Sequence, residues 1–202
     1  MRDTKVLIAV PALDTMPTQT AYCMLTMKRD CPSRFSFIVR ASCHDARNLL
    51  AREAINSGTD RVLWIDSDMV FDDDLMIRLG DDLDAGWDMV GGIYFRRELP
   101  TSPLVYSEIK GAAGKATVWK AYPRDCVFKC AGYGFGAVMM KIELLKELGD
   151  YAFTPMNHLS EDLSFCARAL DAGALIACDS RVKVGHVGQI VIGEQLYKHP
   201  GG

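Results

Sequence analysis

Long hydrophobic runs are missing from this sequence of 202 residues. No uncharged apolar stretch approaches the roughly 18 residues that a membrane-spanning helix requires, so we expect no transmembrane segment. The first apolar run, residues 6–10, ends at Pro11 and lacks the length and the cleavage site of a signal peptide. These absences lead us to expect a cytoplasmic protein.

A strong excess of one charge is also lacking, because 23 Lys and Arg residues stand against 26 Asp and Glu residues. The net charge of −3 gives no overall attraction to nucleic acid or to anionic membranes, although it does not exclude a local basic groove. The seven cysteines are odd in number and mostly lie in apolar segments, which indicates reduced, buried thiols rather than a disulfide framework. Cys126 and Cys130 have no second Cys or His pair at zinc spacing.

The composition, 49% hydrophobic and 24% charged, is that of an ordinary folded domain, and the length predicts a single one. In the first half, apolar runs alternate with segments of helical spacing. We expect strands at 5–10, 35–39, 61–65 and 89–94, and helices opening at Thr18, at Asp45 as N-cap and at Asp72 or Asp73. This alternation predicts an α/β fold with a mostly parallel, doubly wound sheet.

The second half differs, because short β-prone runs separated by glycine-rich turns predict antiparallel or mixed strands. The expected strands are 104–109, 117–122, 126–130, 137–140, 175–178 and 182–187, and the expected helices are 142–148 and 161–172. The last stretch, 191–202, is expected to be a mobile tail.

The most distinctive local motif is Asp66-Ser67-Asp68, which directly follows the apolar run 61–65. Ligands of open α/β sheets bind at the carboxyl ends of strands, and residues i and i+2 of extended chain point to the same side. Two such carboxylates suit Mn²⁺ or Mg²⁺, which commonly join protein carboxylates to substrate phosphates. An acidic turn before a helix would also gather these residues, and it accounts for Asp72 to Asp74 without any function.

Three further motifs carry candidate chemistry. Asp162, in Ser160-Glu161-Asp162-Leu163, could act as a general base or simply complement a helix dipole. His186, flanked by Gly185 and Val187, could complete a metal shell or be an ordinary strand-end histidine. The segment Gly132–Gly136 could let the backbone approach a ligand, with its aromatic residues stacking on a sugar, or could form a tight turn.

Taken in order, these segments resemble the GT-A glycosyltransferases, in particular the family 2-like group. The matching segments are Ala46–Ala51, Val62–Asp68, Gly91–Tyr94, Gly132–Lys141, Ser160–Phe165 and Val184–His186. The resemblance implies a Rossmann-like GT-A sandwich with a mixed, mostly parallel central sheet and helices on both faces. It further implies a nucleotide-sugar-binding half at 1–95 and an acceptor-side half at 96–190 within one catalytic domain.

The resemblance also assigns roles. It implies that Asp66, Asp68 and His186 bind Mn²⁺ or Mg²⁺, and that Asp162 is the general base of an inverting transfer, with Glu161 supporting the acceptor or the helix start. The implied donor-binding residues are Pro11, Ala12, Arg47, Asp66, Ser67, Asp68 and Gly134. The donor is a nucleotide-diphosphate sugar, with UDP-sugars the first expectation, while the acceptor and the oligomeric state stay open. Arg96 and Arg97 have no counterpart in the family, and could either answer phosphate charge or lie in a solvated loop.

Two other functions remain alternatives. Asp66 and Asp68 also fit the nucleophile motif of haloacid-dehalogenase-type phosphatases, although some sixty residues precede the motif here, and no downstream Asp pair with a lysine is evident. The second alternative is a nucleotide-sugar-binding module without catalysis.

Overall fold

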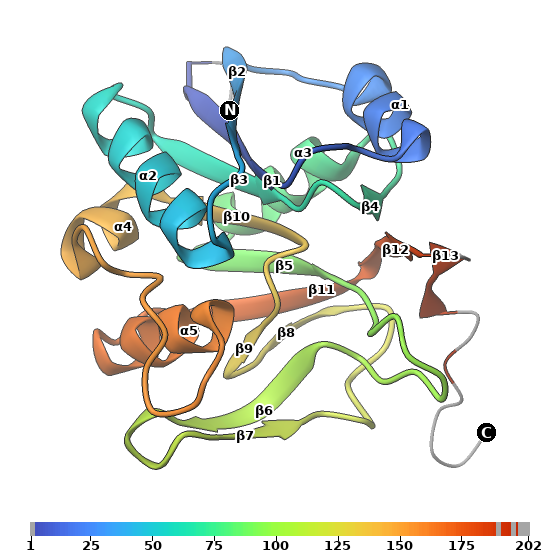
Figure 1. Ribbon diagram of the computed structural model, residues 1–202, viewed down its shortest axis with the longest axis vertical. Helices are drawn as coiled ribbons and strands as arrows, with labels where there is room; N and C mark the ends of the chain where they lie inside the picture. Colours follow the sequence, from blue (N-terminus) through green and yellow to red (C-terminus); the bar gives the residue numbers. More distant parts are fainter. Residues whose placement is uncertain (1–2, 189–190, 195–196, 198–202) are drawn as a thin grey trace.

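The computed structural model of the chain describes residues 3–188, 191–194 and 197 (Figure 1). Its helices are α1 (Thr18–Thr26), α2 (Cys43–Asn56), α3 (Leu75–Asp84), α4 (Ile142–Leu148) and α5 (Glu161–Asp171), with a short 3₁₀ turn at Gly111–Ala113. The strands of the first half are β1 (Val6–Ala12), β2 (Ser33–Val39), β3 (Arg61–Ile65), β4 (Met69–Val70) and β5 (Met89–Ile93). Those of the second half are β6 (Val105–Lys110), β7 (Lys115–Val118), β8 (Val127–Lys129), β9 (Gly132–Tyr133), β10 (Ala137–Lys141), β11 (Ile176–Lys183), β12 (Gly185–Val187) and β13 (Val191–Ile192).

The central sheet has seven strands in the order β2-β1-β3-β10-β5-β11-β8 (Figure 1). β1 pairs in parallel with β2 on one side and with β3 on the other, and β5 pairs in parallel with β11. β10 lies antiparallel between β3 and β5, and β8 lies antiparallel to β11 at the edge. Five strands therefore run in one direction and two against it, which confirms the expected mixed, mostly parallel α/β sheet.

Helices cover both faces of this sheet because its strands alternate buried side chains between the two sides. On β3, Val62 and Trp64 belong to the core cluster that includes α2, α4 and α5. Leu63 and Ile65, one residue along, belong to the cluster that includes α1 and α3. All four side chains are fully buried, and each contributes about 1.5–3 kcal/mol of hydrophobic free energy relative to exposure.

Two small sheets extend this body. β9, β6 and β7 form an antiparallel sheet next to α5, at the lower end of Figure 1. β13, β12 and β4 form a second one. Its register matters for the site, because β4 directly follows the Asp66-Ser67-Asp68 motif and pairs Met69 with His186 of β12.

Most expected elements are present, with some corrections. Helix α2 begins at Cys43 and is capped by Ser42, whose hydroxyl accepts a hydrogen bond from the Asp45 backbone N–H, so the expectation that Asp45 is the N-cap is wrong. The two strands expected at 175–178 and 182–187 are instead a long β11 with an irregularity between Asp179 and Lys183, followed by the separate β12.

Residues 195–196 and 198–202 of the expected mobile tail lie outside the described residues, and Val191–Ile192 within it form β13. Among the helices that the structure describes, none combines the length and apolar character needed to cross a bilayer. All seven cysteines are free thiols, but the expectation that they are buried holds only for Cys130, Cys166 and Cys178, and Cys43 is exposed.

Candidate functional site

A pocket of about 290 Å³ lies beyond the carboxyl ends of β1 and β3. Six of the residues expected at the site line it: Pro11, Ala12, Asp66, Ser67, Asp68 and His186. Asp66 enters it because the last residue of β3 is Ile65, and the Asp66 backbone N–H then donates to the carbonyl of Gly136 at 3.1 Å. The pocket therefore forms at the sheet edge where ligands of open α/β folds bind.

His186 reaches Asp68 through the pairing of β4 with β12. The Val187 backbone N–H donates to the carbonyl of Asp68 at 2.8 Å, and His186 Nε2 lies 3.4 Å from Asp68 Oδ2. On the other side of the ring, His186 Nδ1 lies 3.2 Å from the carbonyl oxygen of Phe95. Because a carbonyl oxygen only accepts, the ring donates to Phe95 through Nδ1, and Nε2 is the ring nitrogen that faces Asp68.

This geometry fits a divalent cation in part. Ligand atoms that share an ion such as Mg²⁺ stand about 3 Å apart, close to the separation of Asp68 Oδ2 and His186 Nε2. Asp66 also lines the pocket, but its Oδ1 is already engaged, because it accepts from Arg47 Nη2 at 2.8 Å. Within the described part of the chain, no cluster of three His, Cys, Asp or Glu residues could hold a metal. Asp68 Oδ2 and His186 Nε2 are the two possible ligand atoms that the described residues bring together at this place.

Charge at the two carboxylates differs. Burial raises the pKa of Asp66 to about 6, helped by the negative charges of Asp68 and Asp162 and opposed by Arg47. Burial would also raise the pKa of Asp68, but His186 and Arg97 outweigh it and hold that pKa below its ordinary value. Asp68 is therefore the more firmly ionised of the pair.

Arg47 joins the pocket to the second acidic motif. Its side chain is only 2% exposed, and its guanidinium lies over the rings of Phe135, Trp64 and Phe153 at 5.1–5.9 Å. Arg47 Nη2 binds Asp66, and Nε lies 3.6 Å from Glu161 Oε1. Arg47 does not itself line the pocket and reaches it through Asp66, so its expected contact with a donor stays a prediction.

Asp162 occupies the first turn of α5, next to Glu161. The Ser160 hydroxyl and the Leu163 backbone N–H, the latter at 2.7 Å, both donate to Asp162 Oδ1. Burial is the main cause of the raised pKa of Asp162, and the negative charge of Glu161 adds to it. A carboxylate with a raised pKa is a better proton acceptor, which is the property that a general base needs.

Gly134 separates Asp162 from Tyr94. A Cβ at Gly134 would lie 1.9 Å from the Tyr94 hydroxyl oxygen and 3.2 Å from Asp162 Oδ2, so only glycine fits there. Gly134 is not among the residues that line the pocket, and its expected contact with a donor stays a prediction. The idea that Tyr133 and Phe135 form a sugar-stacking platform is wrong, because both rings are 1% exposed and pack in the core.

Tyr94 and Arg97 had no firm role in the sequence analysis, yet both belong to the site. The Tyr94 hydroxyl accepts from the Gly136 backbone N–H at 3.2 Å, and its ring packs edge-on against His186 at 5.8 Å. Arg97 lines the pocket, and its Nη1 lies 3.0 Å from Asp68 Oδ2. The sequence signal for both was their place directly after β5, at the same edge of the sheet as Asp66.

A larger hollow of about 570 Å³ lies beside β4 and β12. Two cations at its wall, Arg124 and Lys183, lie 3.6 and 2.5 Å from the carboxylate oxygens of Glu194. Its charges thus offset one another, and none of the expected site residues lines it. The smaller pocket is the better candidate for a charged ligand.

Comparison with known proteins gives the fold alone. No family model matches the chain, and no curated protein matches it. Among solved structures, the chain is similar to that of A197 from STIV, with a TM-score of 0.71 and 18% sequence identity, over 96% of this chain and 94% of that one. At this identity the similarity establishes a shared α/β architecture.

Proposed function

We propose that this chain is a metal-dependent glycosyltransferase of the GT-A type, which moves a sugar from a nucleotide-diphosphate sugar to an acceptor hydroxyl. The observation that carries the proposal is the position of Asp68 and His186. They come from elements far apart in the chain, yet face each other at the carboxyl end of β3, beside a pocket walled by Pro11 and Ala12.

Two groups of residues, one on each side of Arg47, have separate roles in the proposed reaction. Asp68 and His186 would hold Mn²⁺ or Mg²⁺, which supplies positive charge to the diphosphate. Asp162 takes the proton from the acceptor hydroxyl as its oxygen attacks the anomeric carbon. The bond from that carbon to the diphosphate oxygen breaks, and the nucleotide diphosphate leaves. Attack opposite the leaving group inverts the anomeric centre.

Arg47 holds the two groups of residues in fixed relative positions. Its contacts with Asp66 and Glu161 fix the carboxylate that ends β3 relative to the start of α5. A buried arginine beside Asp66 also offsets part of the repulsion between Asp66 and Asp162. Burial raises the pKa of Asp66 and of Tyr94, the charge of Asp162 adds to both rises, and Arg47 opposes both.

The first test is a thermal-shift screen of UDP-, GDP-, CDP- and TDP-sugars, each with and without Mn²⁺. A ligand that binds the folded state raises its apparent stability by mass action, so a metal-dependent shift with one nucleotide is expected. No shift with any nucleotide contradicts the proposal and directs the next assay to phosphate-ester hydrolysis, the alternative chemistry of Asp66.

Variants then separate the roles. Asp68→Ala is expected to abolish the metal-dependent part of nucleotide binding, while Asp72→Ala, an exposed acidic residue just beyond β4, serves as its matched control. Asp162→Asn is expected to lower turnover by roughly 10²–10⁴-fold with nucleotide affinity retained. Equal loss of turnover and affinity in Asp162→Asn would assign Asp162 a structural role instead.

A further inference from the structure

An arginine contacts the Asp68 oxygen that a cation would bind. Arg97 Nη1 lies 3.0 Å from Asp68 Oδ2, the same oxygen that faces His186 Nε2 at 3.4 Å. A divalent cation that binds Asp68 through this oxygen meets the positive guanidinium there. Cation binding and the Arg97–Asp68 pair are therefore in competition for one oxygen atom.

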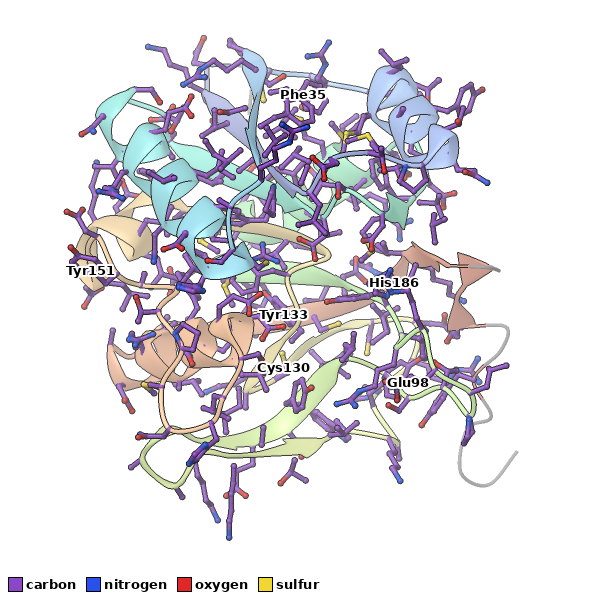
Figure 2. All side chains as sticks on the ribbon, in the orientation of Figure 1. Phe35, Glu98, Cys130, Tyr133, Tyr151 and His186 are labelled. Carbon is purple, nitrogen blue, oxygen red and sulfur yellow. The ribbon has the colours of Figure 1, made fainter. Side chains whose placement is uncertain are left out.

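The loop that carries Arg97 is built so that this arginine can change partners. Its base is fixed, because the Arg96 backbone N–H donates to Ser102 O at 3.0 Å and the Thr101 hydroxyl donates to Arg96 O at 2.7 Å. Its outer part, residues 96–100, is exposed throughout, and Figure 2 shows Glu98 on this loop below His186. The Arg97 side chain is 53% exposed, so its ion pair with Asp68 is weak and can be broken without disturbing the core.

The pocket offers Arg97 a second kind of partner. Arg97 lines it together with Pro11, Asp66 and Asp68, so an anion in the pocket comes within reach of the guanidinium. Guanidinium groups bind phosphate with two parallel hydrogen bonds, a stronger arrangement than the single Nη1 contact to Asp68. A diphosphate would therefore draw Arg97 away from Asp68 and leave the carboxylate to the cation.

We propose that Arg97 binds the donor diphosphate and that, before the donor arrives, it occupies the cation's position on Asp68. The inference rests on the proposed function, because it requires a diphosphate and a cation in this pocket. It makes their binding mutually supportive: the diphosphate removes the competitor of the cation, and the cation removes the partner of Arg97. By linkage, each ligand then raises the affinity for the other by the same factor.

The test measures the two ligands separately. Free Mn²⁺ is followed by its electron paramagnetic resonance signal without nucleotide, and binding of UDP, GDP, CDP and TDP is followed by calorimetry at saturating Mn²⁺. Arg97→Ala is expected to bind Mn²⁺ alone several-fold more tightly than the parent, because Asp68 loses its competitor. The same variant is expected to bind the preferred nucleotide roughly tenfold more weakly, because a charge-assisted contact is lost.

Arg96→Ala is the matched control, since it removes the same charge from the same loop while the Arg96 side chain contacts the Tyr106 hydroxyl. It is expected to leave both affinities near those of the parent. Arg97→Ala that changes both affinities in the same direction, or neither, overturns the inference, and so does an equal effect of Arg96→Ala. A parent protein that binds neither Mn²⁺ nor any of the four nucleotides overturns the proposed function itself.

Discussion

Asp82 and Asp179 form a second pair of carboxyl groups, outside the pocket. Asp82 lies on α3 and Asp179 on β11, and both are buried, with Arg181 Nη2 3.3 Å from Asp82 Oδ1 and 3.0 Å from Asp179 Oδ2. Burial raises the pKa of Asp82 to about 7, with a large contribution from the charge of Asp179 and with Arg181 and Arg78 opposing. Burial would also raise the pKa of Asp179, but the hydrogen bonds and the charge of Arg181 outweigh it and hold that pKa below its ordinary value. Near neutral pH the proton of the pair is therefore on Asp82.

This pair gives the fold a pH dependence with a definite sign. Between about pH 4 and pH 7 the folded protein holds a proton on Asp82 that the unfolded chain has released, so the pair's contribution to stability falls as the pH rises through 7. Asp82→Asn removes the titration. We compare the melting temperature of Asp82→Asn with that of the parent at each pH. The difference, variant minus parent, is expected to be about 3 °C or more larger at pH 8 than at pH 5, because on the order of 1–2 kcal/mol of the parent's free energy of unfolding depends on this titration.

The matched control is Asp81→Asn, because Asp81 is the exposed neighbour on the same helix. Calorimetric melting of both variants at the two pH values decides the matter. A pH-independent difference between Asp82→Asn and the parent would show that the pair does not share a proton.

At this scale, much of the candidate site could be predicted from the sequence. Asp66, Asp68 and His186 carry recognisable residue types in order, and the structure brings them to one edge. For Arg97 the sequence left phosphate binding and a solvated loop as alternatives, because its contact with Asp68 depends on how the loop after β5 turns back. The burial of Tyr133 and Phe135 was missed for a related reason, since aromatic residues suit both a ligand platform and a core.

At the scale of elements, α2 matters most, because it carries Arg47 to the back of the pocket. The Ser42 hydroxyl donates to Asp45 Oδ2 at 2.6 Å and accepts from the Asp45 backbone N–H at 3.3 Å, so it satisfies an N–H group that the first turn leaves free. At the other end of the helix, Gly58 follows the C-cap Ser57 with φ +66°, a left-handed conformation that favours glycine.

Ser42→Ala is expected to lower the free energy of unfolding by about 1 kcal/mol, because it removes this cap. Urea denaturation of the parent, Ser42→Ala and Ser42→Thr measures the effect, with the threonine variant restoring most of the loss. A threonine variant as unstable as the alanine variant would mean that the hydroxyl does not cap α2.

Elements of five or more residues with clear periodicity, such as α4 and β3, were predicted with nearly correct bounds. β4, β9 and β13 are two residues long and were not predicted, because so short a run has no detectable period. Their pairing nevertheless decides the site, since it is β4 that aligns His186 with Asp68.

At the scale of the whole molecule, strands from the two halves of the chain alternate. β10, from the second half, lies between β3 and β5 of the first, and β5 in turn lies between β10 and β11. The expected parallel order of the first half did not include this insertion, because sequence patterns identify strands but not their neighbours. Each half completes the hydrogen bonding of the other.

This interleaving predicts a single unfolding transition. Because β10 contributes to the two core clusters on either side of the sheet, neither half retains its core when the other unfolds. Thermal melting followed by far-ultraviolet circular dichroism and by tryptophan fluorescence is expected to give coincident curves. Separate midpoints for the two probes would contradict the shared core.

The insertion of β10 also affects how the chain folds during translation. β3 reads Arg-Val-Leu-Trp-Ile and leaves the ribosome more than seventy residues before its neighbour β10. During that interval one edge of an apolar strand has no hydrogen-bonding partner, which is the condition under which nascent chains recruit chaperones or associate with one another. The protein's most vulnerable moment thus falls during translation, between the emergence of Ile65 and that of Ala137.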